Sequence, residues 1–155
     1  MSTRTQRLLE EATQQIDTLA DNLTRAGEAA LARPCPGRGK LGDGTVGAVA
    51  THTTDNYRRV AGFLRATAGA GARHPASMHG ARYGAEDVDL GDLLGRLEAA
   101  KHELAVLAEL DGALDTVPAA GDMKFADGER TLEQILASIL KHQRHQVDTL
   151  AAALA

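Results

Sequence analysis

The sequence predicts an all-α fold, most simply a four-helix bundle. Alanine and leucine dominate the composition and β-branched residues are few, which favours helices over strands. Four segments repeat apolar residues at three- and four-residue steps, the spacing of one helix face. A bundle lets four such helices bury their apolar faces against one another. With 155 residues, the chain is expected to form one domain over 1–155.

The first helix is expected from Thr3 to about Ala32. Its apolar stripe consists of Leu8, Leu9, Ala12, Ile16, Leu19, Leu23, Ala26 and Ala30. The stretch PCPGRGKLGDG then ends the helix, because it is too rich in proline and glycine to be regular. It contains Cys35, the single cysteine of the chain, which excludes an internal disulfide framework and indicates a reducing compartment. A plain loop cysteine is a simpler interpretation of Cys35 than a reactive thiol, because no base is adjacent in sequence.

The second helix is expected from about Thr45 to Ala68. Its stripe consists of Val46, Val49, Thr53, Tyr57, Val60 and Leu64, and a second row of His52, Asn56, Arg59 and Phe63 follows one edge. The next segment, GAGARHPASMHGARYGAED, shows no period and predicts a long loop between the second and third helices. Such a loop could run the length of the bundle as a crossover, so an up-down-up-down order is not assumed.

The third helix is expected to begin near Asp89 or Gly91 and to reach about Leu110. Its stripe consists of Leu90, Leu93, Leu94, Leu97, Leu104, Leu107 and Ala108. The residues from 111 to 130 include proline and glycine and predict a second loop.

The fourth helix is expected from Thr131 to Leu154. Its stripe consists of Leu132, Ile135, Leu136, Ile139, Leu150 and Leu154. Thr131 is placed to act as N-cap, and Gln134 follows three residues later, which is the pattern of a capping box.

A polar cluster interrupts the apolar face of this fourth helix. At 100° per residue, Gln143 lies near the centre of the face, Gln146 slightly to one side and His142 further out. His145 falls well off the stripe. Because an unpaired polar group in a core costs a few kcal/mol, this turn either binds something or satisfies a buried partner.

The histidines could form a metal site. His52 of the second helix and His142 of the fourth could meet in the bundle core, where metal ligands come from facing helices. Gln146, four residues on, or His145, three residues on, could supply a further donor. Two imidazoles, one more donor and a water outline a catalytic zinc-type site, although an amide oxygen is a poor first-row ligand. Without a metal, these histidines would be ordinary capped or surface residues.

Composition limits the classes of partner. The net charge of −4 and the scattered Lys and Arg residues argue against nucleic-acid binding. No apolar run reaches the ~18–20 residues of a membrane helix, and the N-terminus lacks the apolar region of a secretory signal. We therefore expect a cytoplasmic protein that acts on a small molecule, with no membrane and no nucleic acid involved.

Two segments resemble the DinB-like bundle superfamily. TVGAVATHTTDNYRRVAGFL resembles the second helix of its mycothiol-dependent maleylpyruvate isomerase-type domains, which carry a Thr-His step and an Asn four residues beyond the His. Here these positions are Thr51, His52 and Asn56. LEQILASILKHQRHQVDTL is similar to the last helix of the superfamily, which has two histidines four apart, often with a third just before the second.

The resemblance implies a metal-binding, DinB-like bundle. His52 and His142 match the first two ligands, Gln146 falls where the superfamily usually has histidine, and His145 matches the extra histidine. The implied cofactors are a divalent metal ion (zinc, nickel or iron) and a low-molecular-weight thiol. The implied activity is a thiol transferase, an isomerase or a hydrolase that activates a thiol or water against a small electrophilic substrate. Bundles of this kind also commonly pair as homodimers.

Two further interpretations stay open. Asn56, Arg59 and Gln143 could orient a bound substrate, whereas no catalytic residue can be assigned. Because Gln146 replaces the third histidine, the chain could instead be a metal-free or weakly metal-binding bundle that binds a small molecule or a partner protein. In the simplest alternative, the polar cluster only sets the register of the helices in the core.

Overall fold

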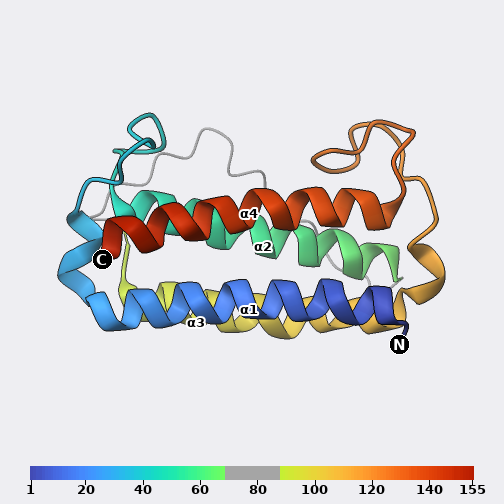
Figure 1. The fold of residues 1–155 in the computed structure, drawn as a ribbon, viewed down its shortest axis with the longest axis horizontal. Helices are drawn as coiled ribbons and strands as arrows, with labels where there is room; N and C mark the ends of the chain where they lie inside the picture. Colours follow the sequence, from blue (N-terminus) through green and yellow to red (C-terminus); the bar gives the residue numbers. More distant parts are fainter. Residues whose placement is uncertain (69–87) are drawn as a thin grey trace.

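The computed structural model describes residues 1–68 and 88–155, and this part of the chain is helical (Figure 1). Its four long helices are α1 (Thr3–Ala26), α2 (Val46–Thr67), α3 (Leu90–Leu104) and α4 (Leu132–Leu154). Three short 3₁₀ helices join them: η1 (Glu28–Ala32), η3 (Ala105–Glu109) and η4 (Asp111–Ala113). No β-strand occurs in the described residues, so the all-α prediction is confirmed. The long loop expected after α2 falls on 69–87, outside the described residues.

The four helices form a bundle in which α1 and α2 each pack against both α3 and α4. α1 and α4 run in one direction, and α2 and α3 run in the other (Figure 1). Contacts between helix ends agree with this arrangement. Glu28, just after α1, accepts a hydrogen bond from the N–H of Leu90 at the start of α3, while Arg4 and Glu133 join the starts of α1 and α4. The order is therefore not simple up-down-up-down.

Each long helix begins at a side-chain cap. Ser2, Thr45 and Asp89 accept hydrogen bonds from backbone N–H groups in the first turns of α1, α2 and α3. Thr131 caps α4, and Gln134 completes the predicted capping box by accepting from the N–H of Thr131. Such caps satisfy backbone donors that the helix itself leaves unpaired, so they fix where each helix starts.

The predicted apolar stripes meet in one core. Its largest fully buried apolar side chains are Ile16, Leu19, Leu23, Leu64, Leu93, Leu97, Leu114, Leu132, Ile135 and Leu150, together with Tyr57. Some polar groups inside this core pair with one another. The Tyr57 hydroxyl donates to Gln15 Oε1 at 2.8 Å, and Gln15 Nε2 donates to the carbonyl of Leu140 at 2.9 Å. This chain of hydrogen bonds ties α2, α1 and α4 together.

The expectation of one helix up to Ala32 was wrong. α1 ends at Ala26 because Gly27 adopts a φ of +82°, a conformation that L side chains rarely take. The Gly27 N–H still bonds to the carbonyl of Leu23, and the chain then continues as η1. The glycine thus redirects the chain earlier than the prolines that follow.

The predicted burial of Ala108 was also wrong. α3 tightens into the 3₁₀ helix η3 at Ala105, and a 3₁₀ helix turns about 120° per residue instead of about 100°. The stripe therefore shifts its phase, so that Leu107 and Leu110 stay buried while Ala108 becomes exposed.

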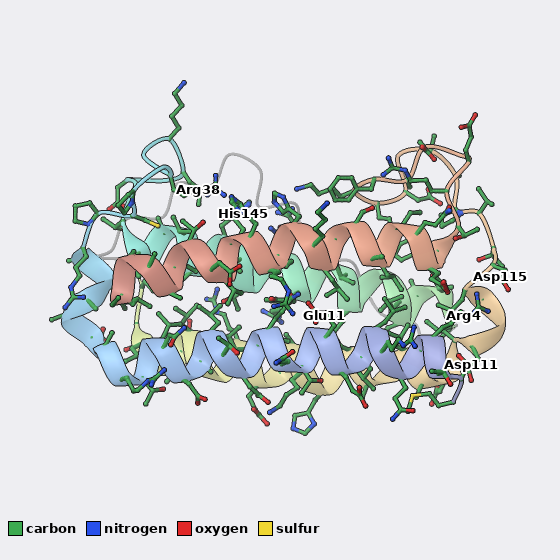
Figure 2. The ribbon with its side chains drawn as sticks, viewed as in Figure 1. Arg4, Glu11, Arg38, Asp111, Asp115 and His145 are labelled. Atoms are coloured by element: carbon green, nitrogen blue, oxygen red, sulfur yellow. The ribbon has the colours of Figure 1, made fainter. Side chains whose placement is uncertain are left out.

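Polar contacts close the end of the bundle where the chain starts (Figure 2). Ser2 and Thr5 donate to Asp111, which lowers the pKa of that carboxyl. Arg4 bonds to both Asp115 and Glu133 at 2.9 Å. These links hold α1 to the segment between α3 and α4. No helix in the part of the chain that the structure describes is both long and apolar enough to cross a membrane.

Candidate functional site

A pocket of about 720 Å³ lies between α2, α4 and the loop that precedes α4. Its lining is His52, Asn56, Arg59, Val60 and Phe63 from α2, Gly121, Asp122, Met123, Lys124 and Phe125 from the loop, and Ile139, His142 and Gln143 from α4. The edge row expected on the second helix faces this pocket because its steps of four, three and four keep one side of the helix. Five candidate site residues of the sequence thus meet in one cavity.

Gln143 fixes the floor of the pocket. It has no exposed surface, and its Nε2 donates to the carbonyl of Thr53 at 2.8 Å. Its Oε1 accepts a hydrogen bond from Asn56 Nδ2 at 3.2 Å. The hydrogen-bond partners that a buried glutamine requires are therefore a backbone carbonyl and a neighbouring side chain. Gln143 orients Asn56 towards a defined position in the pocket wall.

His142 is half-buried in the pocket wall. Burial lowers the pKa of its imidazole, and the positive charges of Lys124, Arg38 and His145 lower it further. The ring packs edge-on against Phe125, with 6.4 Å between ring centroids. Burial and the neighbouring positive charges both favour a neutral imidazole at neutral pH.

Gln146 and His145 do not line this pocket. Gln146 is buried, and its Oε1 accepts a hydrogen bond from Arg38 Nε at 2.9 Å. Arg38 reaches α4 from the loop between α1 and α2. His145 is exposed, and Figure 2 shows it with Arg38 on the side of α4 away from α1. The structure therefore brings together His52 and His142 of the expected ligand set, but gives Gln146 a protein partner.

Of the four expected metal ligands, His52 and His142 line the pocket, whereas Gln146 and His145 do not. Among residues 1–68 and 88–155, no group of three His, Cys, Asp or Glu side chains could hold an ion. The oxygen of Gln146 already binds a guanidinium, and an amide oxygen is a weak first-row ligand. Arg38 and Lys124 also place positive charge near His142, which opposes a bound cation.

Arg59 and Lys124 give the pocket a cationic wall. Arg59 Nε and Nη2 are buried and have no hydrogen-bond partner within the described part of the chain. Lys124 lies at the exposed mouth, where partial burial and the charge of Arg59 lower the pKa of its amine. Asp122, also exposed, is the one carboxylate of the described lining. Positive groups and donors therefore outnumber acidic groups around the cavity.

Phe125 forms part of the loop wall in a strained conformation. Its φ is +69°, and it is the one non-glycine residue with positive φ among those described. The loop around it is held by backbone hydrogen bonds from Gly121 N–H to the carbonyl of Ala126 and from Ala126 N–H to that of Met123. Lys124 Nζ lies 5.3 Å from the centre of the Phe125 ring. Backbone strain of this kind is found most often at active sites and ligand-binding sites, where the surrounding structure enforces it.

Cys35 is buried, with 2% of its surface exposed, and burial raises the pKa of its thiol. Raised pKa and low access oppose thiolate chemistry, which agrees with the interpretation of a plain loop cysteine.

Sequence reasoning missed two parts of the site. The loop wall from Gly121 to Phe125 carries no motif, although an aromatic residue beside a lysine in a glycine-containing loop was a visible signal. The bond from Arg38 to Gln146 joins residues 108 positions apart and leaves no trace in a local pattern. Comparisons with protein-family models, with curated proteins and with solved structures gave no match.

Proposed function

We propose that this protein is a small-molecule-binding bundle whose pocket between α2 and α4 binds a small organic anion. The observation that carries the proposal is Arg59, which lines the pocket with two buried nitrogen atoms that lack hydrogen-bond partners among the described residues. A buried charged donor without an acceptor is costly, and a carboxylate accepts from two nitrogens of a guanidinium at once. A ligand carboxylate would supply the missing acceptor.

The rest of the pocket supports an organic anion over an inorganic one. Its volume of about 720 Å³ falls within the ~300–1,000 Å³ of ordinary small-molecule sites. Apolar side chains from both helices and from the loop line much of it: Val60, Phe63, Met123, Phe125 and Ile139. Lys124 at the mouth adds a second positive charge, and Asn56 adds a neutral donor. The expected ligand therefore has an apolar body and one carboxylate.

Benzoate and benzamide test this proposal, because they differ mainly in charge. Benzoate should raise the melting temperature by about 5–10 °C at about a hundredfold excess over its Kd, and benzamide should have little effect. Arg59→Met removes the charge but keeps an apolar stem, so it should abolish the benzoate effect. Arg65→Met, on the same helix but outside the pocket lining, is the matched control. Equal shifts with benzoate and benzamide, no shift with either, or benzoate binding that survives Arg59→Met would refute the proposal.

A DinB-like metal-dependent enzyme is the second candidate. It is favoured by the bundle of four helices and by His52 and His142 lining the same pocket. In this case a divalent metal and a low-molecular-weight thiol or water would act on a small electrophilic substrate, and the chain would pair as a homodimer. When bound, the metal would supply the Lewis acidity that lowers the pKa of the thiol or water. A zinc titration followed by melting temperature separates the candidates, since an ion bound only by the native state must stabilise it.

A further inference from the structure

A second cavity lies beside the pocket, towards the start of α4. Its volume is about 410 Å³, and it shares Phe63 and Asp122 with the first pocket. Ala66 of α2, Val117 of the loop and Leu132 of α4 form its apolar walls. Because Phe63 and Asp122 border both cavities, the two cavities are adjacent along α2, and we refer to them together as the groove.

Arg59 and Lys124 give the first pocket its positive charge, whereas the second cavity has apolar walls together with the polar residues Thr67, Thr116 and Asp122. Arg59 and Ala66 are seven residues apart on α2, which corresponds to about 10 Å of helix, with Phe63 between them. Val117, which lines the second cavity, is a large apolar residue with 48% of its surface exposed, and this is unusual among the described residues. The polar residues Asn56 and His142 line the first pocket and not the second cavity. On α2, Asn56 is ten residues from Ala66, whereas Arg59 is seven.

We infer that the groove binds an amphipathic alkyl carboxylate. Its carboxylate pairs with Arg59 and Lys124, and its hydrocarbon chain runs past Phe63 to the walls formed by Val117 and Leu132. This inference rests on the proposed function and deepens it, because it assigns the apolar body of the anion a direction and a length. Charge complementarity fixes the head, and the second cavity accommodates the chain.

A series of carboxylates from butyrate through hexanoate to octanoate, measured by titration calorimetry with the full chain, tests the inference. Each added methylene that enters the groove should strengthen binding about fourfold, the equivalent of about 0.8 kcal/mol. Octanol, which has a similar chain without the charge, should bind much more weakly than octanoate. An affinity that does not change with chain length, or octanol that binds as tightly as octanoate, overturns the inference.

Val117→Asp locates the chain within the groove. The new carboxylate should remove the gain between butyrate and octanoate while leaving butyrate binding unchanged, because Val117 lines the second cavity and not the first pocket. Ala119→Asp places the same charge two residues away, at an exposed position outside both cavities, and should leave the gain intact. Octanoate that binds equally to wild type and Val117→Asp overturns the inference.

The two proposals fail in different ways. If neither benzoate nor butyrate shows binding that depends on Arg59, the proposed function itself is wrong. If both short anions bind through Arg59 but the chain-length gain or its dependence on Val117 is missing, the proposed function stands and the amphipathic ligand is wrong.

Discussion

Arg38 brings a positive charge to the polar turn of α4 that contains His142 and Gln146. It donates to Gln146 from a loop far away in sequence, so the amide oxygen that faces the core is held by a cation of the protein itself. Burial lowers the pKa of His142, and the same guanidinium and Lys124 lower it further. The fixed positive groups around the site repel cations and attract carboxylates.

The depressed pKa of His142 has a measurable consequence for stability. In the unfolded chain the imidazole regains its ordinary pKa near 6.5, so below that pH the unfolded state takes up a proton that the folded state resists. Stability is therefore full above about pH 6.5 and decreases as the pH falls, until the folded His142 also protonates. The groups that face it and oppose the proton are Lys124, Arg38 and His145.

Melting temperatures between pH 7.5 and 5 test this consequence. The decrease on acidification should be smaller in His142→Asn than in wild type, because the variant lacks the imidazole whose pKa is depressed. His145→Asn, which changes an exposed histidine three residues away, should keep the wild-type decrease. Identical pH dependence in wild type and His142→Asn would contradict the assignment.

The loop before α4 is the element that turns a helix interface into a pocket. Without it, α2 and α4 would present His52, Asn56 and His142 on an open face. Hydrogen bonds from the N–H groups of Leu132 and Glu133 to carbonyls at Thr116 and Leu114 anchor the base of the loop to the start of α4. Phe125 then closes the wall in a left-handed conformation that costs about 1–2 kcal/mol for an L residue.

The strain at Phe125 predicts an unusual order of stability between two variants. Phe125→Ala loses the ring and keeps the cost of positive φ, whereas Phe125→Gly loses the ring and escapes that cost. In urea denaturation, the free energy of unfolding of Phe125→Gly should therefore be about 1 kcal/mol higher than that of Phe125→Ala. Both should bind benzoate more weakly than wild type, because the ring lines the pocket. Phe125→Ala that equals or exceeds Phe125→Gly in stability would show that the backbone is not strained there.

At the scale of the whole molecule, the helix order places the pocket. Because α2 and α4 are antiparallel neighbours, the end of α2 lies beside the start of α4, where the loop is anchored (Figure 1). The buried chain from Tyr57 through Gln15 to Leu140 holds α1 against these two helices from the other side. The bundle thus supplies a rigid frame on two sides, and the loop supplies the third wall.

Much of this frame could be predicted from the sequence, because it rests on local rules. Helical spacing placed the stripes of all four helices, and Thr131 with Gln134 marked the start of α4. The row from His52 to Phe63 follows from 3.6 residues per turn. What escaped prediction depends on backbone conformation and distant partners. Gly27 ends α1 through a positive φ that its neighbours do not signal, and the change to a 3₁₀ helix at Ala105 exposes Ala108.

The character of the site depended on contacts between segments far apart in the chain. A motif indicates which residues share one face of a helix. It does not show that Arg38 donates a hydrogen bond to Gln146 or that Lys124 lies at the mouth of the pocket. Those contacts place positive charge around the pocket, and this charge is the basis of the proposed anion site.

A crystal structure of the protein with 4-iodobenzoate tests the central claim most directly, because the iodine is located independently by its anomalous scattering. The account predicts the carboxylate within hydrogen-bond distance of Arg59 Nε or Nη2, with the iodine pointing towards Phe63 and the second cavity. A bound molecule whose carboxylate avoids Arg59, or an Arg59 whose buried nitrogens are paired with a carboxylate of the protein itself, would contradict it.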